Sequence, residues 1–162
     1  MRHTLIAALF VAFIPLSVGA AEVLAENRLP NPSFEEKSPG GLVGWTSRAW
    51  AGGDEARLEV VSPGRSGGHC ISIGSAKGTD AAWTAKVTVE AGKAYELSGW
   101  IKTDGVKGAV GALMNIQNIH SVKTSAVTGT SDWGQVRVEF EVGKTSGFRS
   151  RIREVGFETA LI

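Results

Sequence analysis

The sequence has few residues of the kinds that build covalent or catalytic sites. Cys70 is its only cysteine, so an intramolecular disulfide and a zinc site made of several thiolates are both excluded. In the run Gly68-His-Cys-Ile-Ser-Ile73, strand alternation places Cys70 on the face opposite Ile71 and Ile73. We expect a packed, inert thiol at Cys70, since no catalytic partner stands near it in the sequence.

Histidine is scarce too. Once the N-terminal His3 is set aside, only His69 and His120 remain, and neither belongs to a nucleophile or metal motif. Ser66, in Gly64-Arg-Ser-Gly-Gly68, imitates the Gly-x-Ser-x-Gly motif, but a nucleophile elbow needs a following helix and the residues after Ser66 predict a strand. No carboxylate pair stands out as the acid and base of a glycosidase. We therefore predict that the protein is not an enzyme.

The N-terminal segment predicts secretion. Arg2 and His3 precede an apolar run over residues 5–16, and the small residues Val18-Gly-Ala20 follow it, as in a signal peptide cleaved after Ala20. A membrane span needs about 20 apolar residues, and this run is shorter. We expect residues 1–20 to be removed, residues 21–26 to form a linker and residues 27–162 to form one domain. The product is expected in the periplasm or outside the cell.

Neither sign of charge is in excess. The chain carries 17 Lys and Arg and 16 Asp and Glu, and loss of Arg2 with the leader leaves 16 of each and a formal net charge of zero. A neutral chain has no general electrostatic attraction for nucleic acid or for an anionic membrane. We expect neither partner, and we expect a monomer.

No segment after the leader has the periodicity of a helix of ten or more residues. Short alternating runs, separated by turns rich in glycine, predict an all-β chain folded as two antiparallel sheets packed in a sandwich. The predicted strands are residues 58–60, 70–73, 85–89, 95–101, 110–119, 124–127 and 136–142. Residues 46–54 are predicted to form a loop at the edge of the sandwich.

Alternation along the strands separates core positions from surface positions. In the strand 95–101, Tyr95, Leu97 and Ile101 share the inward face, whereas Trp100 lies among polar residues on the other face. A tryptophan on a polar face can stack on a pyranose ring, although cover by a neighbouring strand would explain it equally well. Three other tryptophans are predicted to be structural: Trp45, Trp83 and Trp133.

Four further residues are candidates for ligand contact. Trp50 and Arg48 share parity within residues 46–54 and could line one cleft. Asn115 and Gln117 are amides in an apolar strand, where a core position would leave them in need of partners. Amides suit sugar hydroxyls because they donate and accept at once, and they could equally face water. With Trp100, these four residues make up the predicted ligand-binding set.

Three motifs occur in order along the chain. They are Asn31-Pro-Ser-Phe-Glu35, then Gly92-Lys-Ala-Tyr95 before the strand that carries Trp100, then Trp133-Gly-Gln-Val-Arg-Val-Glu-Phe140. Together they resemble the CenC-type carbohydrate-binding modules over residues 27–142. The resemblance implies a galactose-binding-like jelly roll, which is a β-sandwich, that binds a β-linked polysaccharide or its oligosaccharides without transforming it.

The same resemblance implies a structural calcium with Glu35 as one ligand, although calcium takes six to eight oxygens and one carboxylate does not make a site. The C-terminus departs from the family. Such modules end in an aromatic-Asp-Asp/Asn-hydrophobic segment, and nothing after Val142 matches it. Phe157, Thr159 and Leu161 alternate and could form a substitute strand. Without one, an inner strand would lose its neighbour and expose an edge that promotes aggregation.

Two other hypotheses about function remain open from the sequence. The first is an extracellular protein-interaction or adhesion module, in which Trp100 and Trp50 would anchor a protein partner. The second is a truncated remnant of a larger secreted glycoside hydrolase. A flat interface of more than about 1,000 Å² would favour the protein-interaction module. A hydrolase sequence directly downstream in the DNA would favour the truncated remnant.

Overall fold

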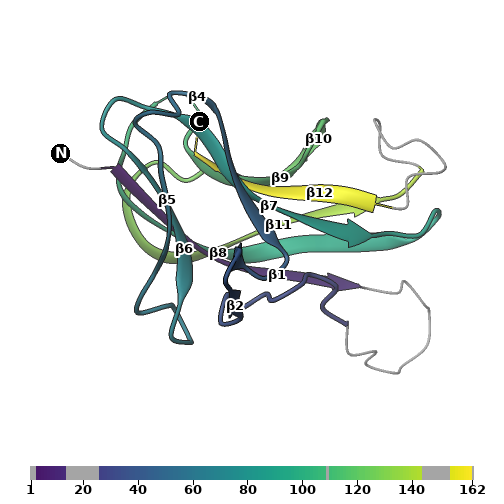
Figure 1. The fold of residues 1–162 in the computed structure, drawn as a ribbon. Coiled ribbons are helices and arrows are strands. Elements are labelled where there is room, and N and C mark those ends of the chain that lie inside the picture. The colour runs from purple at the N-terminus through teal and green to yellow at the C-terminus, as the bar shows by residue number, and fades with distance from the viewer. Residues whose placement is uncertain (1–2, 14–25, 109, 144–153, 162) are drawn as a thin grey trace.

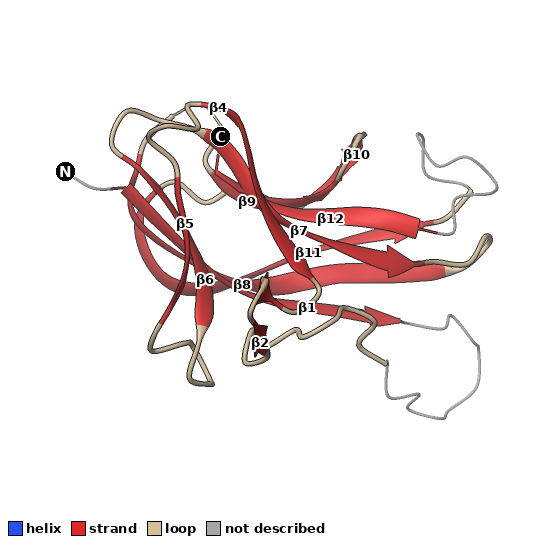
Figure 2. Cartoon of the chain, in the orientation of Figure 1, coloured by secondary structure: helices blue, strands red, loops and turns tan. Residues whose placement is uncertain are grey.

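Two five-stranded sheets lie face to face, with a short two-stranded hairpin beside them (Figures 1 and 2). The computed structural model describes residues 3–13, 26–108, 110–143 and 154–161, and it gives β1 and β12 as backbone. No helix occurs among these residues, and none is therefore present there that could span a membrane. The pairing of neighbouring strands is antiparallel throughout, which confirms the predicted β-sandwich.

Sheet 1 has the strand order β11-β8-β1-β6-β5. Its strands are β1 (His3–Phe13), β5 (Arg57–Val61), β6 (Cys70–Ser75), β8 (Ala94–Val106) and β11 (Gly129–Glu141). Sheet 2 has the order β10-β9-β12-β7-β4. Its strands are β4 (Trp45–Ala51), β7 (Asp80–Thr88), β9 (Ala112–Ile116), β10 (Ile119–Lys123) and β12 (Glu154–Leu161). The hairpin pairs β2 (Lys37–Ser38) with β3 (Gly41–Leu42).

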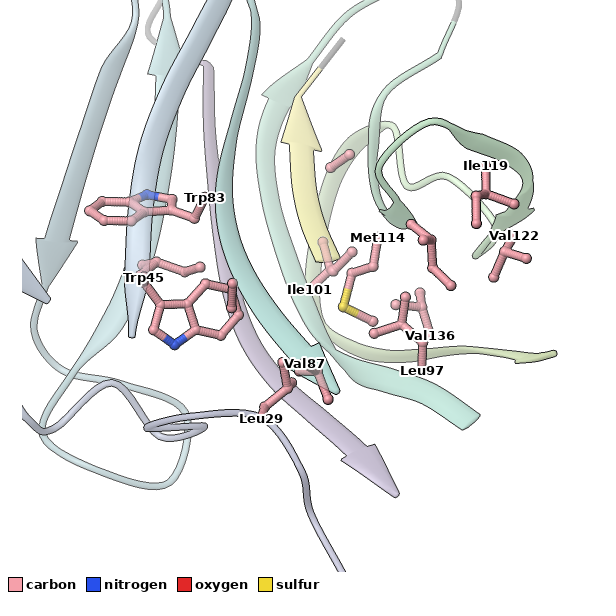
Figure 3. Close-up of a cluster of buried hydrophobic side chains, with 14 of the residues drawn as sticks. Leu29, Trp45, Trp83, Val87, Leu97, Ile101, Met114, Ile119, Val122 and Val136 are labelled. Atoms are coloured by element: carbon pink, nitrogen blue, oxygen red, sulfur yellow. The ribbon is translucent and has the colours of Figure 1, made fainter. Parts of the chain in front are cut away.

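The core fills the space between the two sheets, as alternation predicts. In Figure 3, Trp45, Trp83 and Met114 from sheet 2 share this space with Leu97 and Ile101 from sheet 1. Trp45 is 6% exposed and Trp83 is 7% exposed, so the structural roles predicted for both are confirmed. The indole of Trp83 also reaches across the core, where Nε1 donates to the carbonyl of Ser72 in β6 at 3.2 Å. This bond satisfies the one polar group that a buried tryptophan carries.

Three predicted boundaries are wrong. Residues 110–119 do not form one strand, because β9 ends at Ile116 and the chain turns through Asn118, whose φ is +64°, before β10 begins. Asparagine tolerates this left-handed conformation better than most residues. Residues 124–127 make only an isolated bridge, between Val127 and Ala112. Residues 45–51 are a strand and not a loop: they pair with β7 along the edge of sheet 2.

The two ends of the chain each supply an inner strand. Residues 3–13, within the predicted leader, form β1, which pairs with β8 from Thr4 to Phe13 and with β6 from His3 to Ala7. The alternating C-terminal residues form β12, which pairs with β7 on one side and β9 on the other. The substitute strand expected at the C-terminus is therefore present. Cleavage after Ala20 stays a prediction, and Ala20 itself lies outside the described residues.

Candidate functional site

The outer face of sheet 2 gathers three of the five predicted ligand-binding residues, Arg48, Asn115 and Gln117, and Trp50 lies at its edge on β4. One row of the sheet runs from Thr46 in β4 through Thr84 in β7 and position 158 in β12 to Asn115 in β9. Residues directly opposite each other in an antiparallel pair point to the same face. Inward-facing residues of the same strands, such as Trp83 and Met114, lie in the core, so this row faces away from it.

Arg48 and Gln117 continue this face on its two sides. Arg48 is two residues beyond Thr46 and lies opposite Ala82, while Gln117 follows Asn115 by two positions at the end of β9. Neighbouring strands lie about 4.8 Å apart, so about 14 Å separates β4 from β9 across the face. Arg48 is exposed, and Asn115 and Gln117 are half-buried. A ligand lying across the strands would therefore meet a guanidinium at one end and two amides at the other.

A small apolar cluster forms one part of this face. Ala82 and Leu113 are buried, at 0% and 4% exposure, but they are separate from the main core, and the half-buried Val110 packs against them. The chain just before β9 therefore covers a part of the sheet surface. The hydroxyl of Thr84 donates to the carbonyl of Thr46 at 3.1 Å, which uses that donor within the sheet. Arg48, which lies opposite Ala82, is an exposed cation beside these residues.

Trp50 lies at the end of β4, where the pairing with β7 shifts register between Ala49 and Ala51. Its side chain is 46% exposed, and the other large exposed hydrophobic residue of the described chain is Val43, at 37%. An indole that remains this open has an unoccupied surface, which suits stacking on a sugar ring. Trp50 and Arg48 both lie on this edge strand, but the bulge interrupts the alternation, so their shared parity does not put the two side chains on one face.

Trp100 does not belong to this face. It lies on β8 in sheet 1, where Gln135 of β11 is its direct neighbour. It is half-buried, and Tyr95, Leu97 and Ile101 fill the inward positions of the same strand, so the predicted alternation is confirmed. The guanidinium carbon of Arg65 lies 3.4 Å from the centroid of the Trp100 ring. The five predicted residues therefore occupy two separate surfaces, and one ring face of Trp100 is already covered.

Glu35 holds two loops together. Its Oε1 accepts from the backbone N–H of His69 at 3.0 Å, and its Oε2 lies 2.7 Å from Nδ1 of the same residue. These contacts hold the pKa of Glu35 below its ordinary value, first through the side-chain bond to His69 and then through the backbone bond. Both partners of the carboxylate are nitrogen atoms of His69.

The calcium expected at Glu35 stays a prediction. No group of three or more His, Cys, Asp or Glu side chains that could hold a metal ion occurs in the part of the chain that the structure describes. Calcium takes six to eight oxygen ligands, which can include backbone carbonyls, and Glu35 supplies one carboxylate.

Two other sequence predictions concern residues near sheet 1. Cys70 is fully buried, which confirms the predicted packing, and burial raises the pKa of its thiol to about 11, which favours the inert thiol form. Trp133 is only half-buried and lines a groove of about 530 Å³ together with Arg57, Glu59 and Lys102. Trp133, predicted to be structural at a turn, lies within β11 and is partly exposed on sheet 1.

Sequence reasoning missed Arg65, Thr46 and Thr84. Arg65 stands in a glycine-rich turn, and nothing in the sequence near it points to an aromatic residue 35 positions away. Strand alternation could have identified Thr46 and Thr84. If both segments are treated as strands, Thr46 shares a face with Arg48, and Thr84 shares a face with Ala82. Treating residues 46–54 as a loop hid that pattern.

Comparison with known proteins adds one match. A family model described as a carbohydrate binding domain matches residues 26–153 of the chain. No curated protein matches the chain.

Proposed function

The chain belongs to the carbohydrate-binding domain family that matches residues 26–153, and on this basis we propose that it binds a polysaccharide or oligosaccharide without cleaving it. The proposed site is the outer face of sheet 2. The observation that carries this assignment is the register of the sheet, which brings Arg48 on β4 and Asn115 on β9 to one face. Family membership supports carbohydrate as the ligand, and the register supports the location.

The side chains on this face match the two kinds of surface that a sugar presents. Its hydroxyls both donate and accept hydrogen bonds, and the amides of Asn115 and Gln117 can do the same, while Arg48 adds donors in a planar arrangement. The C–H face of a pyranose is apolar and packs well against an aromatic ring. Trp50 supplies an exposed indole for that contact. Binding then needs no proton transfer and no nucleophile.

Secretion is part of the proposal, because the N-terminal segment has the pattern of a signal peptide. A polysaccharide ligand outside the cytoplasm would be consistent with it. The near-neutral charge of the chain favours recognition by stacking and hydrogen bonding over general electrostatic attraction.

Isothermal titration of the full chain with soluble β-glucan, xylan and galactan oligosaccharides tests the proposal. Arg48→Ala and Trp50→Ala should each weaken binding of the preferred glycan by about tenfold or more, as truncation of a central contact residue usually does. Two matched controls are available: Arg137→Ala removes an exposed arginine from sheet 1, and Val43→Ala truncates the other large exposed hydrophobic residue. Neither control should change the affinity.

Equal losses in Arg48→Ala and Arg137→Ala would mean that charge, and not the face of sheet 2, governs binding. No binding of any glycan by the folded wild-type chain would reject the function itself. A thermal melt of each variant accompanies the titration, because a ligand that binds only the folded state raises the melting temperature and an unfolded variant shows no transition.

A further inference from the structure

A second hollow lies on the other side of the sandwich. It has a volume of about 620 Å³ and is lined by Trp100 of β8, Gln135 of β11, Ser33 and Glu35 of the Asn31–Glu36 turn, and Arg65 and His69 of the loop before β6. Segments that are distant in sequence therefore meet there. The outer face of sheet 2 contributes no residue to this lining.

The floor of the hollow is an arginine stacked on a tryptophan. With its central carbon 3.4 Å from the ring centroid, the guanidinium of Arg65 covers the face of Trp100. A sugar cannot stack on the same ring face while this pair is intact. Stacking leaves the edge of the planar guanidinium available, and that edge carries the N–H groups that bind a carboxylate in a bidentate manner. Arg65 therefore offers a polar contact over the ring on which stacking of a sugar was predicted.

Among the described residues, no carboxylate forms an ion pair with Arg65. The ion pairs given by the described residues join Arg28 with Glu90, His69 with Glu35, Lys77 with Glu55, and Lys102 with Asp132, and none of them includes Arg65. Glu35 lines the same hollow, but its oxygens are engaged by His69. The cation in this hollow therefore lacks an acidic partner within the described chain.

The loop that carries Arg65 is held in place from two directions. The N–H of Gly64 donates to the carbonyl of Gly67 at 3.2 Å, which closes the turn around Arg65. Glu35 then fixes the end of the loop at His69, and it approaches so closely that a Cβ at Gly67 would collide with its Oε1. A cation whose loop is fixed before binding loses less conformational entropy when a ligand arrives.

We propose that the hollow at Trp100 and Arg65 is a second glycan subsite, which takes the carboxylate of a uronic acid unit. The proposal rests on the proposed function, since it assumes a glycan ligand, but it uses a different surface. The guanidinium edge of Arg65 binds the carboxylate, and the amide of Gln135 and the hydroxyl of Ser33 lie in the same hollow to bind sugar hydroxyls. The protein then prefers acidic glycans to neutral glycans of equal length.

The experiment titrates the full chain with trigalacturonate, with its methyl ester and with a sulfated oligosaccharide of similar length. Trigalacturonate should bind at least tenfold more tightly than the ester, and added salt should weaken the difference because part of it is Coulombic. Arg65→Ala should abolish the preference. Arg65→Lys should retain only part of it, because an ammonium keeps the charge and loses the planar pair of donors. Arg137→Ala is the matched control and should leave the preference unchanged.

The outcomes separate this inference from the proposed function. Binding that depends on Arg48 and not on Arg65, with the ester as good a ligand as the acid, overturns the subsite and leaves the proposed function standing. Binding of the acid that depends on Arg65 while Arg48→Ala has no effect supports the subsite and rejects the face of sheet 2. A preference for the sulfated ligand that Arg65→Ala removes would show an anion site, but would overturn its assignment to a carboxylate. Melting curves confirm that each variant is folded.

Discussion

Trp45 should be the most costly single residue to truncate near the Asn31–Glu36 turn. Its side chain is 6% exposed, and its Nε1 donates to the carbonyl of Pro30 at 2.9 Å. Its ring meets Phe34 edge to face, with 5.2 Å between centroids and 61° between planes. Gly44, immediately before it, lies so close to Pro30 that a Cβ there would be 2.5 Å from the proline Cβ. The indole is therefore held by its ring contact with Phe34 and by its hydrogen bond to Pro30.

The contacts give magnitudes for two substitutions. Trp45→Phe removes the N–H and leaves the Pro30 carbonyl without its donor, which costs about 1–3 kcal/mol when a polar group is left unsatisfied away from water. Trp45→Ala also opens a cavity and should cost about 3–5 kcal/mol. A domain of this size is stable by only about 5–15 kcal/mol, so the second loss is a large fraction of the total.

Urea unfolding of the full chain, followed by far-ultraviolet circular dichroism, measures both losses without relying on tryptophan emission. Trp50→Ala is the matched control, because the same side chain is removed from an exposed position, and its effect should stay within about 0.5 kcal/mol. A cycle with Phe34→Leu should yield a coupling of about 0.5–1.5 kcal/mol for the edge-to-face pair. If Trp45→Ala cost no more than Trp50→Ala, the packing assigned to the Trp45 indole would be wrong.

Two further predictions concern β1 and Glu35. Removing residues 1–20 deletes β1, so β6 and β8 lose the strand between them. Residues 21–162 should therefore melt at a lower temperature than the full chain, or associate through the exposed strand edges. A thermal melt and light scattering measure these effects, and an equally stable monomer would show that β1 does not stabilise the fold. The folded-state pKa of Glu35 lies below its ordinary value of 4.5, so the stability it contributes is complete above that value and is lost as the pH falls through the lower, folded-state pKa. The melting temperature should therefore fall more steeply on acidification in the wild type than in Glu35→Gln, and Glu36→Gln, which keeps the His69 contact, should behave as the wild type does.

The sequence predicted the parts of the fold that depend on local pattern. Alternation placed Tyr95 and Leu97 in the core and Trp100 on the surface, because a strand has a fixed period of two whatever it pairs with. The same pattern did not predict the turn at Asn118. No glycine or proline marks that turn in the sequence. The one residue there that tolerates a left-handed conformation is Asn118, whose φ is positive in the structure.

The candidate site was less accessible from the sequence, because it depends on which strands become neighbours. Arg48 and Asn115 share a face only because β12, from the far end of the chain, lies between β7 and β9. Trp100 is separated from them because β8 joins the other sheet. The stacking of Arg65 on Trp100 joins residues with no common pattern in the sequence. Long-range pairing of this kind leaves no periodic trace along the chain.

The Asn31–Glu36 turn shows how one short motif can serve both proposed surfaces. The side chain of Asn31 donates to the carbonyls of Glu36 at 2.9 Å and Val43 at 3.2 Å, which fixes the approach to β4.

Phe34, fully buried against Trp45, anchors the first residue of β4, the strand that carries Arg48 and Trp50. Glu35 points the other way and fixes the loop that places Arg65 over Trp100. These contacts account for the asparagine, the phenylalanine and the glutamate of the motif by packing and hydrogen bonding. Each of the three side chains therefore has a structural role in placing β4 or the loop before β6.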